Sequence, residues 1–324
     1  MRSRKEHIMA IVVPCYNEHE VIRDTNEKLI SLINKLKSDM IINANSYIYY
    51  VDDGSEDETW SIIKNICLQN QNIKGLRLSR NFGHQNALLA GLSKVNKKCD
   101  FVISIDADLQ QDIKAIPKMI KKYNLGSEIV FGIRNKRKGE TIFKRFFSDS
   151  FNKIMKLSGS SIIKDHADFR LMGRKALKVL LEHHEDNIFL RGLIPKLGFQ
   201  TAEVKFDQSE RSLGKTKYSP LKMINLAYDG LSSLSSTPLR FLFLLGFLST
   251  LSSIIWAIYV IYAKYVTGQI VLGWASIILS IWFFSSIQLM ALGLIGEYLS
   301  KIFFDIKKLP RFIIEELDSQ EWVQ

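Results

Sequence analysis

Short apolar runs alternate with amphipathic segments along the first part of the chain. The apolar runs are rich in β-branched and aromatic residues and occupy 8–13, 47–51, 73–78, 101–105 and 128–132. Segments whose apolar residues recur at helical spacing lie at 21–37, 59–68 and 87–92. Strands that alternate with helices predict βαβ units and a parallel sheet whose loops gather at one edge. The pattern therefore predicts an α/β fold.

The run at 101–105 ends in two carboxylates, Asp106 and Asp108, which one residue separates. Its apolar character is typical of a strand that is buried on both faces. Ligands of open α/β sheets bind outside the carboxyl ends of the strands, and carboxylates in such a position bind hard divalent cations. A solvated turn in which an aspartate caps the next helix would have the same sequence. This stretch alone leaves both interpretations open.

Polar residues follow the other predicted strands as well. They are Asn17 and Glu18, then Asp52 and Asp53, then Arg80 and His84. Right-handed crossovers bring these loops to the same edge as Asp106 and Asp108, where they can bind one ligand together. The chain contains neither GxGxxG nor GxxxxGK[ST], so we expect no glycine-rich phosphate loop. If the ligand is a nucleotide, a metal ion held by the acidic pair could bind its diphosphate in place of such a loop.

Two later runs, 241–263 and 270–296, contain no charged side chain. Each exceeds the roughly 20 apolar residues that cross a bilayer, so the sequence predicts two transmembrane helices. Basic residues flank the pair, whereas the connector 264–269 has only Lys264. By the positive-inside rule both termini are cytoplasmic. We therefore expect a multi-pass protein of the cell membrane, with the predicted α/β domain in the cytoplasm.

Composition narrows the choice of partners and compartment. The net charge of +11 would suit nucleic acid, but beside two membrane helices it favours an anionic membrane surface or lipid, and we expect no nucleic-acid partner. The start MRSRKEH has no separate apolar signal-peptide region between its charges and the first predicted strand, so we expect no cleavable signal peptide. Three cysteines without CxxC spacing argue against a disulfide framework or a zinc site.

Seven segments, taken in order, resemble one enzyme family. PCYNE at 14–18, DDGSED at 52–57, SRNFG at 79–83 and DADLQ at 106–110 resemble the inverting glycosyltransferases of family 2, which have the GT-A fold. ADFRLMGR at 167–174, QSERSLGKTKYS at 208–219 and GEYLSKIFFDIKKLPRF at 296–312 resemble the branch that transfers a sugar to a polyprenyl phosphate. That branch contains the dolichol-phosphate-mannose synthases and the bacterial undecaprenyl-phosphate glucosyltransferases. The family usually has an acidic or histidine residue and prolines after DLQ, whereas this chain has Gln111, Asp112 and Ile113.

The resemblance implies a GT-A, Rossmann-like catalytic domain at 1–216. A juxtamembrane interfacial helix at 217–237, two transmembrane helices within 238–298 and a cytoplasmic basic tail at 299–324 complete the predicted organisation. Apolar residues recur at helical spacing in 143–155 and, more loosely, in 221–234. Such segments can lie in the membrane interface and hold the catalytic edge against the bilayer, although the first could equally pack on the sheet.

By the resemblance, the acidic loops bind the sugar donor. Asp106 and Asp108 would hold Mg²⁺ or Mn²⁺, which neutralises the leaving diphosphate, with Gln110 near the metal. Asp52 and Asp53 would accept hydrogen bonds from the base or the ribose, although a turn or helix-cap role is also open for Asp52. The other residues predicted for the nucleotide-sugar pocket are Pro14, Tyr16, Glu18 and Arg80.

The acceptor needs positive charge more than a general base, because a lipid phosphate has a second pKa of about 6 and is mostly ionised at neutral pH. We predict Arg134, Arg211 and Lys215 as its ligands. Asp168 is, by the resemblance, the candidate base or orienting carboxylate, and Asp165 competes with it. The predicted catalytic residues are Asp108, Asp168 and Arg134.

The sequence thus predicts an enzyme that transfers a hexose, with inversion, from a nucleoside-diphosphate sugar to undecaprenyl or another polyprenyl phosphate. UDP-glucose or a related UDP-hexose is the expected donor, and the lipid-linked sugar would serve cell-envelope glycosylation. A processive polysaccharide synthase should have more spans and a QxxRW motif, which the sequence lacks. A non-catalytic scaffold that binds nucleotide-sugars is disfavoured by the intact acidic pair. The sugar, the base and the oligomeric state, homo-oligomers included, are open.

Overall fold

The computed structural model describes residues 6–135, 166–183, 190–207, 273–307 and 310–318, together with scattered positions between 246 and 266. Its strands form one sheet in the order β7-β5-β6-β4-β1-β2-β3-β8. The strands are β1 (Met9–Cys15), β2 (Tyr47–Asp52), β3 (Ile73–Leu78), β4 (Phe101–Ser104), β5 (Ile129–Arg134), β6 (His166–Gly173), β7 (Thr201–Phe206) and β8 (Ile314–Leu317).

The centre of the sheet is parallel and both flanks contain a reversed strand. β3, β2, β1 and β4 run in one direction, and β6 runs against both β4 and β5. β5 therefore has the direction of β4, with β7 parallel beside it, and β8 runs against β3 at the other end of the sheet. As a result, the carboxyl ends of β1 to β5 lie at one edge of the sheet.

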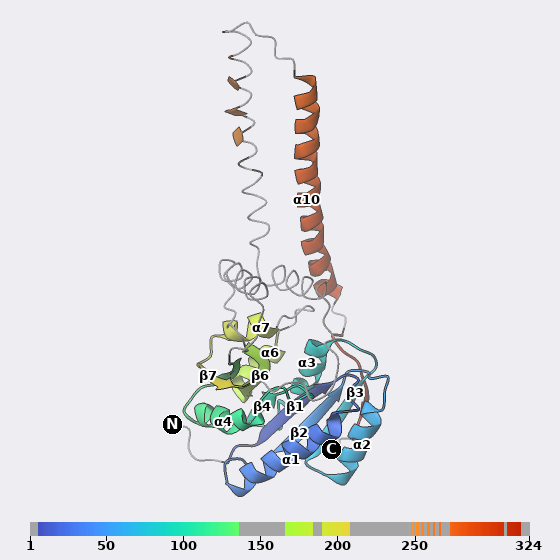
Figure 1. The fold of residues 1–324 in the computed structure, drawn as a ribbon, viewed down its shortest axis with the longest axis vertical. Coiled ribbons are helices and arrows are strands. Elements are labelled where there is room, and N and C mark those ends of the chain that lie inside the picture. Colours follow the sequence, from blue (N-terminus) through green and yellow to red (C-terminus); the bar gives the residue numbers. More distant parts are fainter. Residues whose placement is uncertain are drawn as a thin grey trace.

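Helices cover both faces of the sheet (Figure 1). The helical elements are α1 (Ile22–Ser38), α2 (Thr59–Gln69), α3 (His84–Val95), η1 (Ile113–Ala115), α4 (Ile116–Asn124), α6 (Arg174–Leu181), α7 (Leu190–Leu193), η2 (Ile194–Leu197) and α10 (Trp274–Lys307). α1, α2 and α4 share one apolar cluster with the sheet, and α3, α6 and α7 share the other. Apolar burial on both faces explains why all seven residues of β1 are buried.

Between residues 8 and 134 the predicted strands and helices are confirmed to within about two residues, except that α3 extends about three residues beyond its predicted apolar segment at each end. The prediction missed β6 and β7. In β6 the buried positions include Asp168 and Arg170, whose charges hide the apolar pattern of a strand. β7 buries only Val204 and Phe206, which is a weak signal. All three cysteines are buried and free, as expected without a disulfide framework.

The predicted cytoplasmic tail at 299–324 needs correction. α10 continues to Lys307, and Ile314–Leu317 then adds a strand to the sheet, next to β3. The catalytic domain therefore includes a segment from beyond the predicted boundary at residue 216. The tail was predicted from the basic residues that follow the second apolar run, whereas the apolar residues Ile314 and Leu317 of this strand pack against the sheet.

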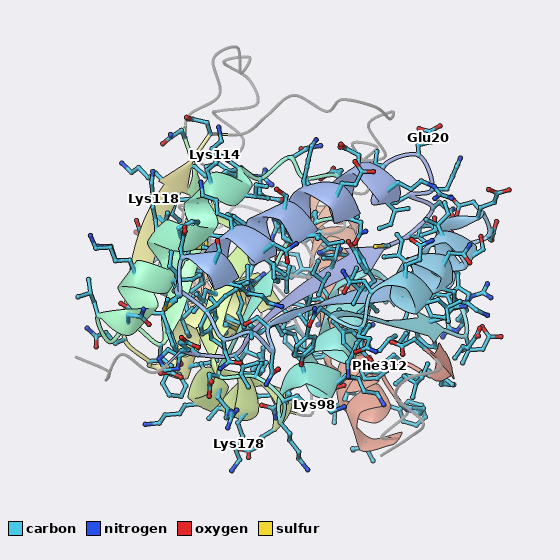
Figure 2. All side chains as sticks on the ribbon, turned by 90° about the horizontal axis from the view of Figure 1, so that it is seen from below. Glu20, Lys98, Lys114, Lys118, Lys178 and Phe312 are labelled. Carbon is cyan, nitrogen blue, oxygen red and sulfur yellow. The ribbon has the colours of Figure 1, made fainter. Side chains whose placement is uncertain are left out.

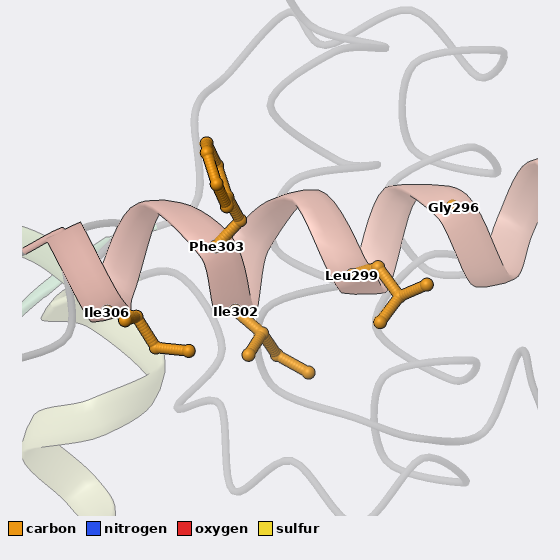
Figure 3. Close-up of a pocket in the computed structure, with 5 residues that line it drawn as sticks. All are labelled: Gly296, Leu299, Ile302, Phe303 and Ile306. Atoms are coloured by element: carbon orange, nitrogen blue, oxygen red, sulfur yellow. The ribbon is translucent and has the colours of Figure 1, made fainter.

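α10 extends away from the sheet (Figure 1) and exposes large apolar side chains, among them Ile281, Leu289 and Leu292. Toward its end a hollow of about 440 Å³ is lined by Gly296, Leu299, Ile302, Phe303 and Ile306 (Figure 3). In the part of the chain that the structure describes, no helix combines the length and apolar character needed to cross a membrane.

Candidate active site at the carboxyl edge of the sheet

The loops that follow β1 and β2 are joined by backbone hydrogen bonds. Asn17 has a left-handed φ of 53°, and its backbone N–H donates to the Ser55 hydroxyl at 3.0 Å. The Asn17 side chain in turn accepts a hydrogen bond from the Glu56 N–H at 3.0 Å, and the Glu18 N–H donates to Thr59 Oγ1 at 2.9 Å. PCYNE and DDGSED thus form one rigid unit at the sheet edge. Within it Pro14 is buried in β1, whereas Tyr16 and Glu18 are half-buried.

Asp53 holds the loop that follows β3. Its two carboxylate oxygens accept hydrogen bonds from the backbone N–H groups of Phe82 and Gly83, at 2.8 and 3.0 Å. Burial raises the pKa of Asp53 to about 6, although these hydrogen bonds oppose the rise. The neighbouring Gly54 has a φ of 65°, and a Cβ there would come within 2.4 Å of the Arg80 carbonyl carbon, so only glycine fits. Asp53 therefore connects two loops in addition to any contact with a ligand.

Asp52 is completely buried beside Asp53. Its Oδ2 accepts a hydrogen bond from the Ser55 N–H at 3.2 Å and lies 3.4 Å from Nε of Arg77. Burial raises the pKa of Asp52, and the charge of Arg77 opposes that rise. The second oxygen, Oδ1, is buried without a hydrogen-bond partner. It is the atom of Asp52 that could accept a hydrogen bond from a bound ligand, provided that the loop opens to admit one.

The acidic pair lies in a tight turn after β4. Leu109 has a φ of 43°, and its N–H donates to the Asp106 carbonyl at 3.2 Å. Gln110 donates to Asp108 through both its backbone N–H and its side-chain amide, at 3.2 and 3.0 Å. Thr25 of α1 is buried, and its hydroxyl donates to the Ala107 carbonyl at 2.5 Å. Both carboxylates are half-buried, and the turn is fixed from two sides.

The donor set of this turn suits a hard divalent cation. The donors are the carboxylate oxygens of Asp106 and Asp108. Gln111 supports Asp106 by donating a hydrogen bond from its side-chain amide N–H. The Oε1 of Gln111 is buried and has no hydrogen-bond partner. No group of three or more histidine, cysteine, aspartate or glutamate side chains suited to a metal occurs in the described residues. Two carboxylates leave further coordination positions to water and phosphate oxygens, as is usual where Mg²⁺ binds together with a phosphorylated substrate.

Asp168 is clamped by two arginines. Arg170, which is fully buried, forms an ion pair with Asp168 Oδ1, and Arg191 of α7 donates to Oδ2 at 2.7 Å. Burial alone would raise the pKa of Asp168, but the two guanidinium groups hold it well below its usual range. A carboxylate held in this way is a weak base. Of the two roles that the sequence left open, the geometry favours the orienting one.

His84 lies between the two acidic groups. Its Nε2 is 3.6 Å from Asp106 Oδ1 and 3.8 Å from Asp168 Oδ2. The Ser104 hydroxyl also donates to the Asp168 carbonyl at 2.5 Å, which ties β6 to the strand that carries the acidic pair. Asp168 and Asp106 thus belong to one cluster, although 62 positions separate them in the sequence.

Of the remaining predicted site residues, the structure describes Arg134 and Arg80. Arg134 is half-buried at the end of β5, on the catalytic edge, and Arg80 is exposed, with its guanidinium carbon 4.2 Å from the centre of the Phe82 ring. Arg211, Lys215 and Asp165 lie outside the described residues, as do the segments 136–138, 143–155 and 221–234. Sequence reasoning missed Arg170, Arg191 and Thr25. Only Arg170 stands in a quoted motif; Arg191 and Thr25 carry no local signal.

The parallel sheet, its acidic turn and the clamped aspartate define the class of a nucleotide-sugar glycosyltransferase of the GT-A type. The family model "Glycosyl transferase family 2" matches residues 10–181, and the chain belongs to that family. An uncharacterized glycosyltransferase of Bacillus subtilis, YkoT, is 44% identical over 313 residues, which cover 97% of this chain and 93% of the relative. The prophage bactoprenol glucosyl transferase homolog of Escherichia coli is 33% identical, covering 95% of this chain and 99% of the relative.

Among solved structures, the mannosyltransferase PcManGT of Pyrobaculum calidifontis, in complex with GDP-Man and Mn²⁺, is similar with a TM-score of 0.43. It is 14% identical in sequence, and the match covers 91% of this chain and 88% of that one.

Proposed function

We propose that this glycosyltransferase moves a hexose from a nucleoside-diphosphate sugar to a polyprenyl phosphate at the cytoplasmic face of a membrane. The observation that carries the proposal is the cluster of Asp106, Asp108, His84 and Asp168 at the carboxyl edge of the sheet. The similarity to a bactoprenol glucosyl transferase homolog over nearly the whole chain supports a polyprenyl acceptor.

In this proposal the acidic turn binds the donor. Asp106 and Asp108 would hold Mg²⁺ or Mn²⁺, and the bound cation supplies charge neutralisation for the leaving diphosphate. Thr25 and the hydrogen bonds of Gln110 keep the two carboxylates at a fixed spacing. The loops joined by Asn17 and Asp53 form the nucleoside side of the pocket. A UDP-hexose such as UDP-glucose is the donor that we propose.

The acceptor side requires cations that approach the same edge. We propose that Arg134, at the end of β5, binds the acceptor phosphate, and that Arg211 and Lys215 join it from the segment that precedes the first apolar run. Asp168 does not need to remove a proton, because the acceptor phosphate is already ionised at neutral pH. We propose that its ionised carboxylate, fixed by Arg170 and Arg191, orients the sugar or the His84 imidazole.

The membrane location rests on the sequence and on the surface of α10. The charge-free runs 241–263 and 270–296 are each long enough for one span. Exposed apolar side chains along α10, and the apolar hollow near its end (Figure 3), are surfaces that lipid chains would cover. The prenyl tail of the acceptor stays in the bilayer, so a membrane anchor would keep the active site close to the acceptor phosphate at the membrane surface.

The test is transfer to lipid in a defined system. Purified full-length protein is incubated with polyprenyl phosphate in vesicles, a divalent cation and each labelled nucleotide-sugar in turn, and the lipid is then extracted. We expect label in the lipid fraction with one donor, and no label when a chelator is present. Efficient transfer to water-soluble sugar acceptors, or no labelled lipid with any donor, would contradict the proposal.

A further inference from the structure

The chain returns to the catalytic sheet after α10. β8 pairs with β3 in antiparallel register, with Leu76 opposite Leu317 and Arg77 opposite Glu316. Further hydrogen bonds run from Ser79 N–H to the Ile313 carbonyl at 3.0 Å, from Asp318 N–H to the Gly75 carbonyl at 3.0 Å and from Gly75 N–H to Asp318 Oδ2 at 2.8 Å. Phe312, which lies beside α3 in Figure 2, packs with Ile314 and Leu317 on the apolar cluster beneath that helix. The connection is therefore a packed part of the domain.

Two adjacent glutamates of β8 make different contacts. Glu316 accepts a hydrogen bond from Trp60 Nε1 at 2.8 Å and forms an ion pair with Lys64 at 2.7 Å, so it fastens β8 to α2. Glu315 Oε2 instead lies 3.6 Å from Nε of Arg77. Glu316 thus forms its hydrogen bond and ion pair with a helix, although it also lies opposite Arg77 in the strand pairing and is attracted by its charge. Glu315 forms its ion pair with Arg77 itself.

Arg77 connects β8 to the loop after β2. Its Nη2 donates to the Ser55 carbonyl at 3.1 Å, and its Nε lies 3.4 Å from Oδ2 of the buried Asp52. Ser55 itself donates its N–H to Asp52. A single guanidinium therefore contacts the backbone and the carboxylate of the DDGSED loop on one side, and the C-terminal strand on the other.

We propose that Arg77 is a positioning residue for nucleotide-sugar binding, and that β8 sets its position through Glu315 and the β3 pairing. The inference rests on the proposed function, in which the DDGSED loop binds the nucleoside part of the donor. It means that the strand directly after α10 holds the donor loop in its binding conformation. α10 is thereby connected to the donor loop through the contacts of Arg77 with Glu315 and with Asp52. The acidic turn takes no part in this connection.

The contrasting explanation is that β8 only covers the edge of β3, since an unpaired edge strand invites aggregation. On that explanation Glu315 and Glu316 are equivalent, because both serve to attach the strand. The two explanations differ in what they predict for donor affinity, and the adjacent glutamates provide a matched pair to separate them. Glu315→Lys and Glu316→Lys change the net charge equally, at neighbouring positions.

The experiment uses full-length protein and measures the KM for UDP-glucose, the KM for polyprenyl phosphate, the Tm and the Kd for UDP. We expect Glu315→Lys, which repels Arg77, to raise the KM for UDP-glucose and the Kd for UDP roughly threefold to tenfold, with the lipid KM unchanged. Glu316→Lys should lower the Tm and change both donor constants clearly less than Glu315→Lys does, because Glu316 forms its ion pair with Lys64 and interacts with Arg77 only across the strand pairing. Arg77→Met should have the larger effect on donor binding, and Arg77→Lys should recover part of it.

Equal donor constants for Glu315→Lys and Glu316→Lys, or unchanged donor binding in a folded Arg77→Met protein, would overturn the inference. The UDP titration separates this outcome from a failure of the proposed function. A wild-type protein that binds UDP but labels no lipid would contradict the proposed acceptor, while the comparison of UDP affinities would still decide the role of Arg77.

Discussion

Thr25 and Ala107 are 82 positions apart, yet the Thr25 hydroxyl donates a hydrogen bond of 2.5 Å to the Ala107 carbonyl. Ala107 stands between the two aspartates of the acidic turn, so a buried residue of the first helix fixes the backbone from which both carboxylates project. The hydrogen bond stabilises a turn in which Leu109 has the left-handed φ of 43°, a backbone conformation that is costly for a residue other than glycine. No sequence motif near Asp106 or Asp108 indicates this hydrogen bond from the first helix.

Replacing Thr25 by valine should weaken cation binding. Valine has nearly the same shape, but it leaves the Ala107 carbonyl buried without its donor, at a cost of about 1–3 kcal/mol. We expect a lower Tm and a severalfold higher cation concentration for half-maximal activity. Thr25→Ser restores the hydroxyl and should restore the cation dependence. If Thr25→Val lowers the Tm without changing the cation dependence, Thr25 supports only the fold.

Replacing Asp108 by asparagine should reduce transfer by at least about a hundredfold, because removing one carboxylate from the proposed cation site costs roughly 3 kcal/mol or more of transition-state stabilisation. The matched control is Asp112→Asn, four positions later. Asp112 caps η1 by accepting a hydrogen bond from the Lys114 N–H, which asparagine can also do. Activity of Asp108→Asn in the presence of a chelator would exclude the metal role.

Asp53 should make stability depend on pH between about 4 and 6. Its pKa in the folded protein, about 6, is above that of the unfolded chain, so the fold disfavours its ionised form. The free energy of unfolding should therefore fall as the pH rises through this window, by roughly 3 kcal/mol at most. Asp53→Asn should reduce that slope and leave the part that the buried Asp52 and Asp106 contribute, whereas Asp39→Asn, at an exposed helix end, should keep the whole slope. Denaturant titrations at several pH values measure the difference.

Replacing Asp168 by asparagine should be strongly destabilising. The change leaves the fully buried Arg170 without its counter-charge, which typically costs about 3–5 kcal/mol. Arg191→Gln should cost less, because the Arg191 side chain is 39% exposed and solvent screens its pair. The depressed pKa of Asp168 means that its stabilisation persists down to strongly acidic pH. A Tm for Asp168→Asn equal to that of Arg191→Gln would show that Arg170 does not depend on this pair.

The elements that could be predicted from the sequence are those whose residues are set mainly by burial in the sheet. The parallel strands are buried on both faces, so their apolar runs were visible in the sequence, as were the acidic residues that end them. β6 was not predicted because Asp168 and Arg170 interrupt its apolar pattern. In the folded protein both are buried and their opposite charges form an ion pair. β8 escaped because Glu315 and Glu316 find partners 238 or more positions away. Contacts between such distant residues leave no periodic pattern, and the same holds for Thr25 and Arg191.

The proposed acceptor cations should separate lipid use from donor use. Arg211→Ala combined with Lys215→Ala removes two positive charges from the segment before the first apolar run, where an anionic phosphate must approach. We expect the KM for polyprenyl phosphate to rise at least tenfold, with the Kd for UDP unchanged. Lys98→Ala combined with Lys178→Ala removes the same charge at two surface positions (Figure 2) and should leave both constants unchanged. An equal loss of UDP affinity in the first variant would move Arg211 and Lys215 to the donor site.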